Sequence, residues 1–138
     1  MEKNKQWRFT PPTHVLAAFH QAINEYEKEG GIVGRLKRYS NNCKIICDGM
    51  KEIGFQQLLS DDLQAPIIIT FMQPQNANFK FDQFYDVLSE KGFLIYPGKL
   101  TVANTFRIGC IGNLTSNDMH NVLQAIKETI KELKIQIN

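Results

Sequence analysis

The most constraining feature of this sequence is a long run of apolar residues spaced alternately four and three positions apart. Seven such residues lie between positions 32 and 53, and each step returns to the same side of an α-helix. Gly54 follows, a residue type common just after a helix C-terminus. The pattern predicts one continuous amphipathic helix that buries its apolar side. The seven residues are Ile32, Leu36, Tyr39, Cys43, Ile46, Met50 and Ile53.

The same periodicity predicts three further helices. One follows Pro11-Pro12 and ends at Gly30-Gly31, and a second begins at Phe81 and ends at Gly92. The last begins after Thr115 or Ser116 as its N-cap, with an acidic residue in its first turn. Each has apolar residues at three- and four-residue steps, so each is expected to pack one side against a core.

Four short segments have the composition of β-strands. The most apolar of them, Ile67 to Phe71, suits a strand buried from both sides. The others are Phe55 to Leu59, Phe93 to Tyr96 and Thr105 to Ile108. Taken with the helices, the order predicts an α+β fold in which helices pack on one side of a small antiparallel or mixed sheet.

Composition limits what the chain can do. Its 138 residues suit one domain, and 16 Lys and Arg against 14 Asp and Glu leave a net charge of only +2, too small to indicate nucleic acid or an anionic membrane as a partner. No apolar run is long enough to span a bilayer, and Met1 to Thr10 lacks the apolar core of a secretory signal. We therefore expect a cytoplasmic protein, in which three cysteines stay reduced.

Several residue patterns are weak candidates for chemistry. Cys43 and Cys47 lie four apart on the long helix without further ligands at suitable spacing, so they are interpreted, with Cys110, as packing residues rather than as a metal site or a nucleophile. Gly98-Lys99 departs from the spacing of a phosphate-binding loop, which excludes a nucleoside triphosphate site. Surface or capping roles are expected for His14, His20 and His120, and a solvated helix face for Arg35, Lys37 and Arg38.

Arg107 differs from these candidates because it lies inside an apolar strand. Strand alternation places it on the face opposite Phe106 and Ile108. There its guanidinium could form two parallel charge-assisted hydrogen bonds to a carboxylate or a phosphonate. The alternative is an edge-strand arginine that only faces water.

Four segments, taken together and in order, resemble the C-terminal part of the 2-aminoethylphosphonate:pyruvate aminotransferases, which are class V enzymes that use pyridoxal phosphate. They are Gln6 to Val15, Glu29 to Gly31, Gly92 to Lys99 and Phe106 to Gly112. The resemblance implies the small C-terminal domain of a fold-type I transaminase. It also implies a homodimer whose active sites lie between the large and small domains and at the subunit interface.

The resemblance implies roles for three residues. Arg107 would bind the acidic group of the substrate, which favours the functional reading of this arginine. Thr10 would donate a hydrogen bond to the cofactor phosphate in the neighbouring subunit, and Trp7 would lie near the same phosphate. Residues 1–12 would then form an arm between domains, and residues 13–138 the small domain.

The chain also departs from the family. Such enzymes hold the cofactor on a lysine of the large domain, with an aspartate beside the pyridine nitrogen, and neither motif has a counterpart here. We therefore expect the N-terminal large domain to be missing, as in a product of truncation or proteolysis. This chain alone is expected to bind no cofactor and to be inactive, and its helices should carry apolar surface meant for the missing domain.

For the intact enzyme, the resemblance implies transfer of the amine of 2-aminoethylphosphonate to pyruvate, which gives phosphonoacetaldehyde and L-alanine. Two alternatives remain at this point. The chain could come from a class V enzyme that acts on serine, alanine or glyoxylate, since these share the architecture and the arginine. It could also be a free-standing α+β module for binding or oligomerisation, without chemistry of its own.

Overall fold

The computed structural model describes residues 7–98 and 103–137. It divides the chain into two compact units, Met1–Arg35 and Leu36–Asn138, and each is described by itself. None of the helices in the described ranges is both long and apolar enough to cross a membrane.

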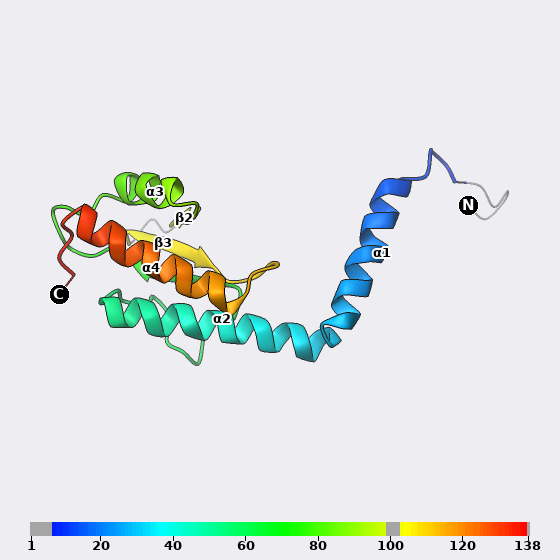
Figure 1. Ribbon diagram of the computed structural model, residues 1–138, viewed down its shortest axis with the longest axis horizontal. Helices are drawn as coiled ribbons and strands as arrows, with labels where there is room; N and C mark the ends of the chain where they lie inside the picture. Colours follow the sequence, from blue (N-terminus) through cyan, green and yellow to red (C-terminus); the bar gives the residue numbers. More distant parts are fainter. Residues whose placement is uncertain (1–6, 99–102, 138) are drawn as a thin grey trace. The chain divides into compact units, whose positions relative to one another are not determined.

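The first unit consists mainly of helix α1, Thr13–Lys28 (Figure 1). The helix begins after Pro12, as expected, and its C-terminal end is followed by Gly30, whose φ of 95° suits glycine. Every side chain of α1 is at least partly exposed, so the apolar side of this helix has no cover within its unit. Its largest exposed apolar side chains are Val15, Leu16, Phe19 and Ile23.

Helix α2, Gly31–Ile53, confirms the helix predicted from the alternating spacing. Its apolar residues are not equally buried. Cys43, Ile46 and Met50 are buried, whereas Ile32 and Leu36 are 74% and 53% exposed. Only the part of α2 that lies well inside the second unit therefore contributes to the hydrophobic core.

The second unit contains a three-stranded antiparallel sheet in the order β1-β3-β2. Its strands are β1 (Ile68–Met72), β2 (Tyr96–Pro97) and β3 (Thr105–Gly109). In the central strand, Arg107 is paired with Thr70 of β1 and with Tyr96 of β2. The expected α+β class is confirmed, and the sheet is antiparallel throughout.

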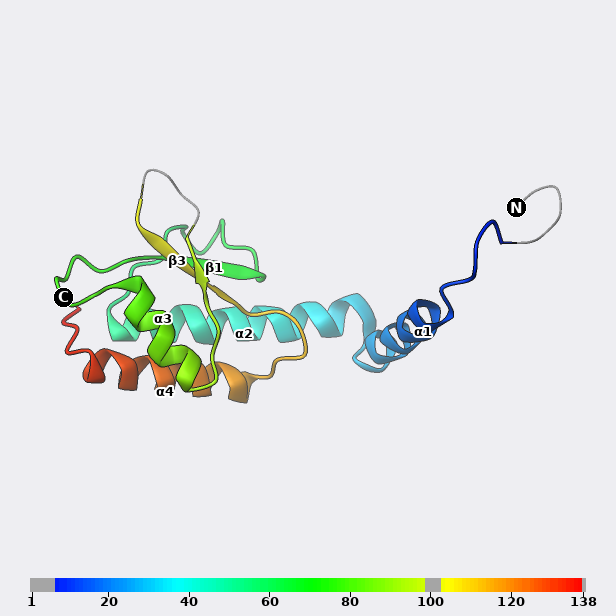
Figure 2. The ribbon, with the colours of Figure 1, turned by 90° about the horizontal axis from the view of Figure 1, so that it is seen from above.

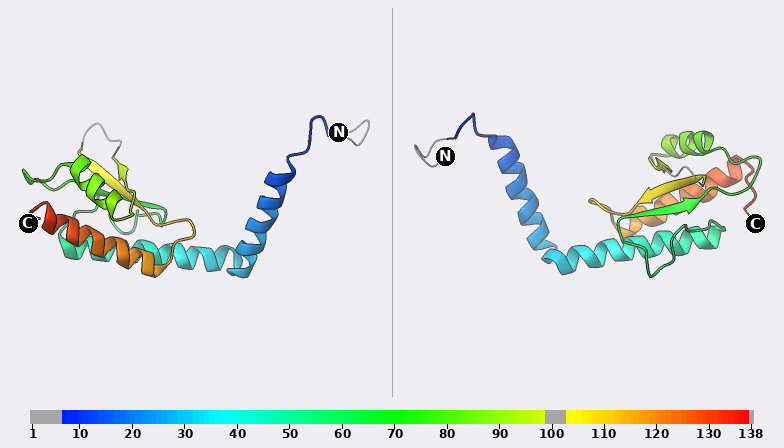
Figure 3. Two further views of the ribbon diagram at one scale, coloured as in Figure 1. Left: turned by 45° about the horizontal axis from the view of Figure 1, so that its top comes forward. Right: turned by 180° about the vertical axis from the view of Figure 1, so that it is seen from behind.

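Helices cover one face of this sheet. Figure 2 shows α2, α3 (Phe81–Glu90) and α4 (Ser116–Glu132) on the same side of the strands. The right-hand view of Figure 3 shows the strands in front of these helices when the unit is seen from the other side. We call the face away from the helices the open face. It carries Ile68, Thr70 and Met72 of β1 and Arg107 of β3, all half-buried.

The strands of the structure differ from the predicted strands in three places. Residues 55–59 pair with β1 only through a bridge, Gln57 to Phe71, whose two hydrogen bonds run from Leu58 N–H to Thr70 O and from Met72 N–H to Gln56 O. Phe55 itself does not pair, because its N–H bonds Met50 O at the end of α2. Likewise, the Phe93 N–H bonds Leu88 O, so β2 starts later than predicted. The apolar strand β1 is buried on one side only, since helices cover only one face of the sheet.

Phe106 is the centre of the core between the sheet and the helices. Its side chain is fully buried, and its ring lies 5.4 to 6.3 Å, centroid to centroid, from five other phenylalanine rings. Such tilted and edge-on contacts add to the free energy gained from burying apolar area. The five neighbours are Phe55, Phe71, Phe79, Phe81 and Phe84.

Helix α4 begins with a capping box at Thr115, one of the two residues, with Ser116, that the sequence offered as its N-cap. The Thr115 hydroxyl accepts a hydrogen bond from the Asp118 N–H, and the Asp118 carboxylate accepts one from the Thr115 N–H at 2.7 Å. These bonds satisfy backbone donors that have no partner inside the helix. Hydrogen bonds from the Thr115 hydroxyl and N–H hold the pKa of Asp118 below its ordinary value.

We expect Asp118→Asn to lower the free energy of unfolding near neutral pH but not in strong acid. A carboxylate with a lowered pKa in the folded state stabilises that state above its unfolded pKa, and this contribution disappears as pH falls through the folded pKa. Urea unfolding at several pH values measures the difference. Asp82→Asn is the matched control, because Asp82 lies in the first turn of α3, where no side-chain cap is formed. An equal difference at all pH values would contradict the expectation.

Candidate functional site

Arg107 lies on the open face of the sheet, as strand alternation predicted. Its neighbours in β3, Phe106 and Ile108, are buried toward the helices, whereas Arg107 is half-buried on the other side. Because directly paired residues of antiparallel strands share a face, Thr70 and Tyr96 lie on either side of it. The hydroxyl groups of Thr70 and Tyr96 therefore lie on the two strands that flank the strand of the Arg107 guanidinium.

The hydrogen bonds of Arg107 leave most of its donors available. Its Nε donates to the carbonyl oxygen of Pro97 at 3.2 Å. Within the described part of the chain, Arg107 forms no ion pair with an acidic side chain. A guanidinium has five N–H donors, so the two terminal nitrogens can present four of them to a ligand. This arrangement suits an anion with two or more oxygens, such as a carboxylate or a phosphonate.

The loop after β3 is held by the second-unit part of α2. Asn42, fully buried, donates from Nδ2 to the carbonyl oxygens of Cys110, at 3.3 Å, and Leu114, at 3.0 Å. Arg38 donates to the carbonyl oxygens of Gly112 and Leu114. These bonds anchor the segment that directly follows the strand of Arg107, and sequence reasoning missed the role of Asn42.

The expected solvated basic face is therefore wrong for two of its three residues. Arg38 bonds the loop after β3, and Arg35 forms an ion pair with Glu29, with Nε 2.8 Å from Oε2. Only Lys37 is exposed as expected. Helical spacing shows which residues share a face, but it does not show which carbonyls or carboxylates a distant segment brings to that face.

Trp7 and Thr10 lie in the first unit and are both exposed. Arg107 lies in the second unit, so the three residues expected at the active site are not brought together within one unit. What the first unit does provide is an exposed hydroxyl and an exposed indole close together in sequence, just before α1.

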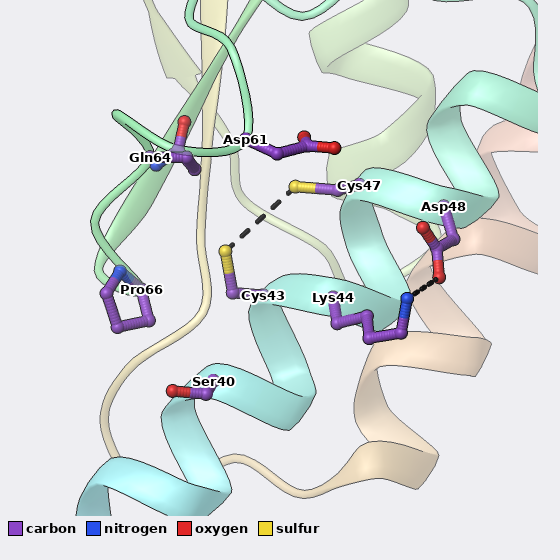
Figure 4. A pocket seen from close by; sticks show the side chains of 8 residues that line it. All are labelled: Ser40, Cys43, Lys44, Cys47, Asp48, Asp61, Gln64 and Pro66. Atoms are coloured by element: carbon purple, nitrogen blue, oxygen red, sulfur yellow. Dashed lines mark hydrogen bonds and ion pairs between the residues drawn. The ribbon is translucent and has the colours of Figure 1, made fainter.

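Cys43 and Cys47 line a shallow pocket of about 280 Å³ between α2 and the segment before β1 (Figure 4). Their sulfur atoms are 4.0 Å apart, and Asp61 and Gln64 line the opposite side. Burial raises the pKa of the Cys47 thiol to about 12, which removes the thiolate needed for nucleophilic attack. Among the residues described, no three histidine, cysteine or acidic side chains converge as metal ligands.

The remaining candidates add no chemistry. Burial also raises the pKa of Cys110 to about 12, and its thiol donates to Ile67 O. The three histidines, His14, His20 and His120, are exposed, with His20 Nδ1 3.4 Å from the Asn24 amide. The Gly98-Lys99 pair, whose spacing departs from that of a phosphate-binding loop, is only partly described, because Lys99 lies outside the described residues.

The sequence is similar to bacterial 2-aminoethylphosphonate–pyruvate transaminases over nearly its whole length. It is 50% identical over 135 residues to the transaminase of Rhizobium meliloti, and 47% identical over 135 residues to that of Pseudomonas aeruginosa. Each match covers 98% of this chain but only 35% and 36% of those proteins, so the chain spans about a third of the length of the curated relatives it matches. No model of a known protein family matches the chain.

Solved structures show the same fold at low sequence identity. A ureidoglycine-glyoxylate aminotransferase from Bacillus subtilis matches 89% of this chain and 32% of its own, with a TM-score of 0.76 and 20% identity. An aspartate aminotransferase from Thermus thermophilus matches 71% of this chain and 27% of its own, with a TM-score of 0.61 and 15% identity. The fold is that of the small domain of an aminotransferase.

Proposed function

We propose, because this chain is homologous to 2-aminoethylphosphonate–pyruvate transaminases, that it forms the C-terminal, anion-binding part of such an enzyme. The whole enzyme would transfer the amine of 2-aminoethylphosphonate to pyruvate, giving phosphonoacetaldehyde and L-alanine. The identity of 50% over 98% of the chain supports this substrate pair above other class V reactions. The three reduced cysteines suit a cytoplasmic enzyme.

The observation that carries the proposal is the position of Arg107. Its side chain lies on the open face of the sheet, and no acidic side chain of the described ranges pairs with it. The phosphonate of the first substrate and the carboxylate of the second each offer two oxygens to a planar guanidinium. One arginine could therefore anchor both substrates in turn and orient each reacting carbon.

The two residues assigned to the cofactor, Thr10 and Trp7, are too few to hold it alone. Thr10 and Trp7 offer one hydroxyl and one indole N–H, both exposed, which suits two hydrogen bonds to a phosphate but cannot enclose a pyridine ring. Pyridoxal phosphate, when bound in the whole enzyme, supplies the electron sink for amine transfer. The part of the reaction assigned to this chain is limited to binding and orienting the substrate anion.

The proposed organisation places residues 1–12 as an arm between domains and residues 13–138 as the small domain. The large domain with the cofactor lysine would lie outside this sequence, and two copies of the enzyme would form a dimer. The exposed apolar side of α1 supports this arrangement, because solvent-exposed apolar residues gathered on one helix are typical of a surface that another domain covers. Val15 and Phe19 are the most exposed of them, at 66% and 63%.

A domain exchange tests the proposed function. In the Rhizobium meliloti transaminase, the matching residues are replaced by this chain, which makes what we call the exchange enzyme. We expect it to convert 2-aminoethylphosphonate and pyruvate with kcat/KM within about tenfold of the parent, a change of about 1.4 kcal/mol in activation free energy, because half of the exchanged residues are unchanged. The products phosphonoacetaldehyde and alanine are measured directly.

Two controls make the result specific. The chain alone, given pyridoxal phosphate and both substrates, is expected to produce no alanine. The exchange enzyme is also assayed with serine and glyoxylate, to separate this reaction from other class V reactions. A folded exchange enzyme that prefers serine would contradict the substrate assignment. A folded exchange enzyme without any activity, beside a chain that binds methylphosphonate, would favour a free-standing binding module.

A further inference from the structure

Gly98, the residue directly after β2, packs against Thr105 of β3 with no room for a side chain. A Cβ atom built on Gly98 would overlap the side-chain oxygen and the carbonyl oxygen of Thr105 and lie 2.7 Å from the Thr105 carbonyl carbon. Gly98 has no positive φ, so glycine is needed here for space and not for its backbone conformation. The Gly98 N–H donates to Thr105 O at 2.9 Å, which closes the contact.

Thr105 is buried under this contact. It is 3% exposed, and its hydroxyl has no hydrogen-bond partner within the described part of the chain. A buried hydroxyl without a partner costs free energy, so the Thr105 hydroxyl itself gives the contact no stabilising hydrogen bond. The tight contact therefore serves the position of the backbone at β2 rather than the hydrogen bonding of the side chain.

The backbone atom that the contact places is the carbonyl oxygen of Pro97, directly before Gly98. It accepts the hydrogen bond from Arg107 Nε at 3.2 Å. A guanidinium can hold a two-oxygen anion side-on, through Nε and one terminal nitrogen, or end-on, through both terminal nitrogens. Because Nε has a single hydrogen and Pro97 accepts it, only the end-on mode remains.

We propose that Gly98 and Thr105 are positioning residues that make Arg107 an end-on anion receptor. Gly98 allows the backbone after Pro97 to pack directly against Thr105. The Pro97 carbonyl oxygen is then placed to accept the hydrogen bond from Arg107 Nε. The substrate anion binds across the two terminal nitrogens of Arg107. It therefore lies further from the backbone of β3 than an anion bound side-on would lie. This proposal rests on the proposed function for the identity of the anion, but the occupation of Nε does not depend on it.

Arginine side-chain NMR of the 138-residue chain tests the proposal without cofactor or activity. The Arg107 Nε–H signal is assigned by its loss in Arg107→Lys. We expect this proton to exchange with water more slowly than those of exposed arginines, and Gly98→Ala to raise its exchange rate about tenfold, as loss of one hydrogen bond allows. Gly109→Ala is the matched control, because a Cβ there has no neighbour within 4 Å and its φ is not positive. It should leave the exchange rate unchanged.

A slow Nε–H that is insensitive to Gly98→Ala in a folded protein would overturn the proposal. If Gly98→Ala does not fold, the test rests on the wild-type chain. A wild-type Arg107 Nε–H that exchanges with water as fast as in exposed arginines would also overturn the proposal. Titration with methylphosphonate then tests the binding mode, and we expect the terminal NH₂ signals to shift while the protected Nε–H stays in place. A shift of Nε–H instead would show side-on binding and refute the end-on mode. Protection of Nε–H without any response to methylphosphonate would support the positioning role and count against the proposed function.

Discussion

Arg107→Ala in the exchange enzyme is expected to lower kcat/KM for 2-aminoethylphosphonate by about a hundred- to a thousandfold. Two charge-assisted hydrogen bonds are lost at once, and together they are worth roughly 3–4 kcal/mol. The same substitution should weaken the use of pyruvate, because one guanidinium is assigned to both anions. Arg107→Lys keeps the charge but loses the paired donors, so its effect should be intermediate.

Steady-state kinetics with each substrate varied in turn measure this loss. The effect should appear mainly in KM, with the cofactor absorbance and the thermal unfolding of the exchange enzyme unchanged. Lys127→Ala is a suitable control, since it removes an exposed cation from α4 on the helix side of the sheet. Kinetics of Arg107→Ala that equal those of this control would refute the assignment of Arg107 as the anion-binding residue.

Phe106→Ala is expected to lower the free energy of unfolding of the second unit more than any other single truncation proposed here. Truncating a fully buried phenylalanine typically costs about 3–5 kcal/mol, which is a large share of the ~5–15 kcal/mol that stabilises a domain of this size. The cost should lie near the upper end here, because five other phenylalanine rings contact the Phe106 ring and cannot all close the cavity.

Urea unfolding and near-UV circular dichroism of the chain report this loss directly. Phe106→Leu, which keeps most of the volume, should retain the fold with a smaller loss of stability. Phe9→Ala is the matched control, because Phe9 is 77% exposed and its removal should change the free energy of unfolding by less than about 0.5 kcal/mol. A Phe106→Ala protein with an unchanged unfolding midpoint would show that the aromatic cluster is not the core of the unit.

Arg107→Ala and Phe106→Ala probe opposite faces of the same strand, β3. Phe106 points into the helices and holds β3 in place, and Arg107 then points to the open face. The binding residue is therefore supported directly by the core, which limits how far its backbone can move. A site built on a central strand is more precise than one built on a loop.

Much of the second unit could be predicted from local pattern. The helical periods located α2, α3 and α4 to within one or two residues, and Thr115 was one of the two residues predicted as the N-cap of α4. Strands were predicted less well. Phe55 and Phe93 have strand-forming side chains, but their N–H groups bond carbonyl oxygens of the preceding helices after a glycine, so neither of these two residues begins a strand.

Sequence alone also did not show which apolar residues are buried. The alternating spacing of α2 continues from Ile32 to Ile53, yet only its later members are covered. Periodicity reports that a helix has an apolar side, and burial depends on what another segment brings to that side. Helix α1 shows the same limit of periodicity. It was correctly predicted as an amphipathic helix, yet none of its side chains is fully buried.

By itself, the sequence determined the helices, the α+β class and the side of the strand on which Arg107 lies, because these follow from periods of 3.6 and 2 along a continuous chain. Only the tertiary structure decided that the Pro97 carbonyl accepts from Arg107 Nε and that Asn42 and Arg38 anchor the loop after β3. These features join segments separated by ten to seventy-six residues, and such pairings depend on the packing of the whole unit, which no local pattern records.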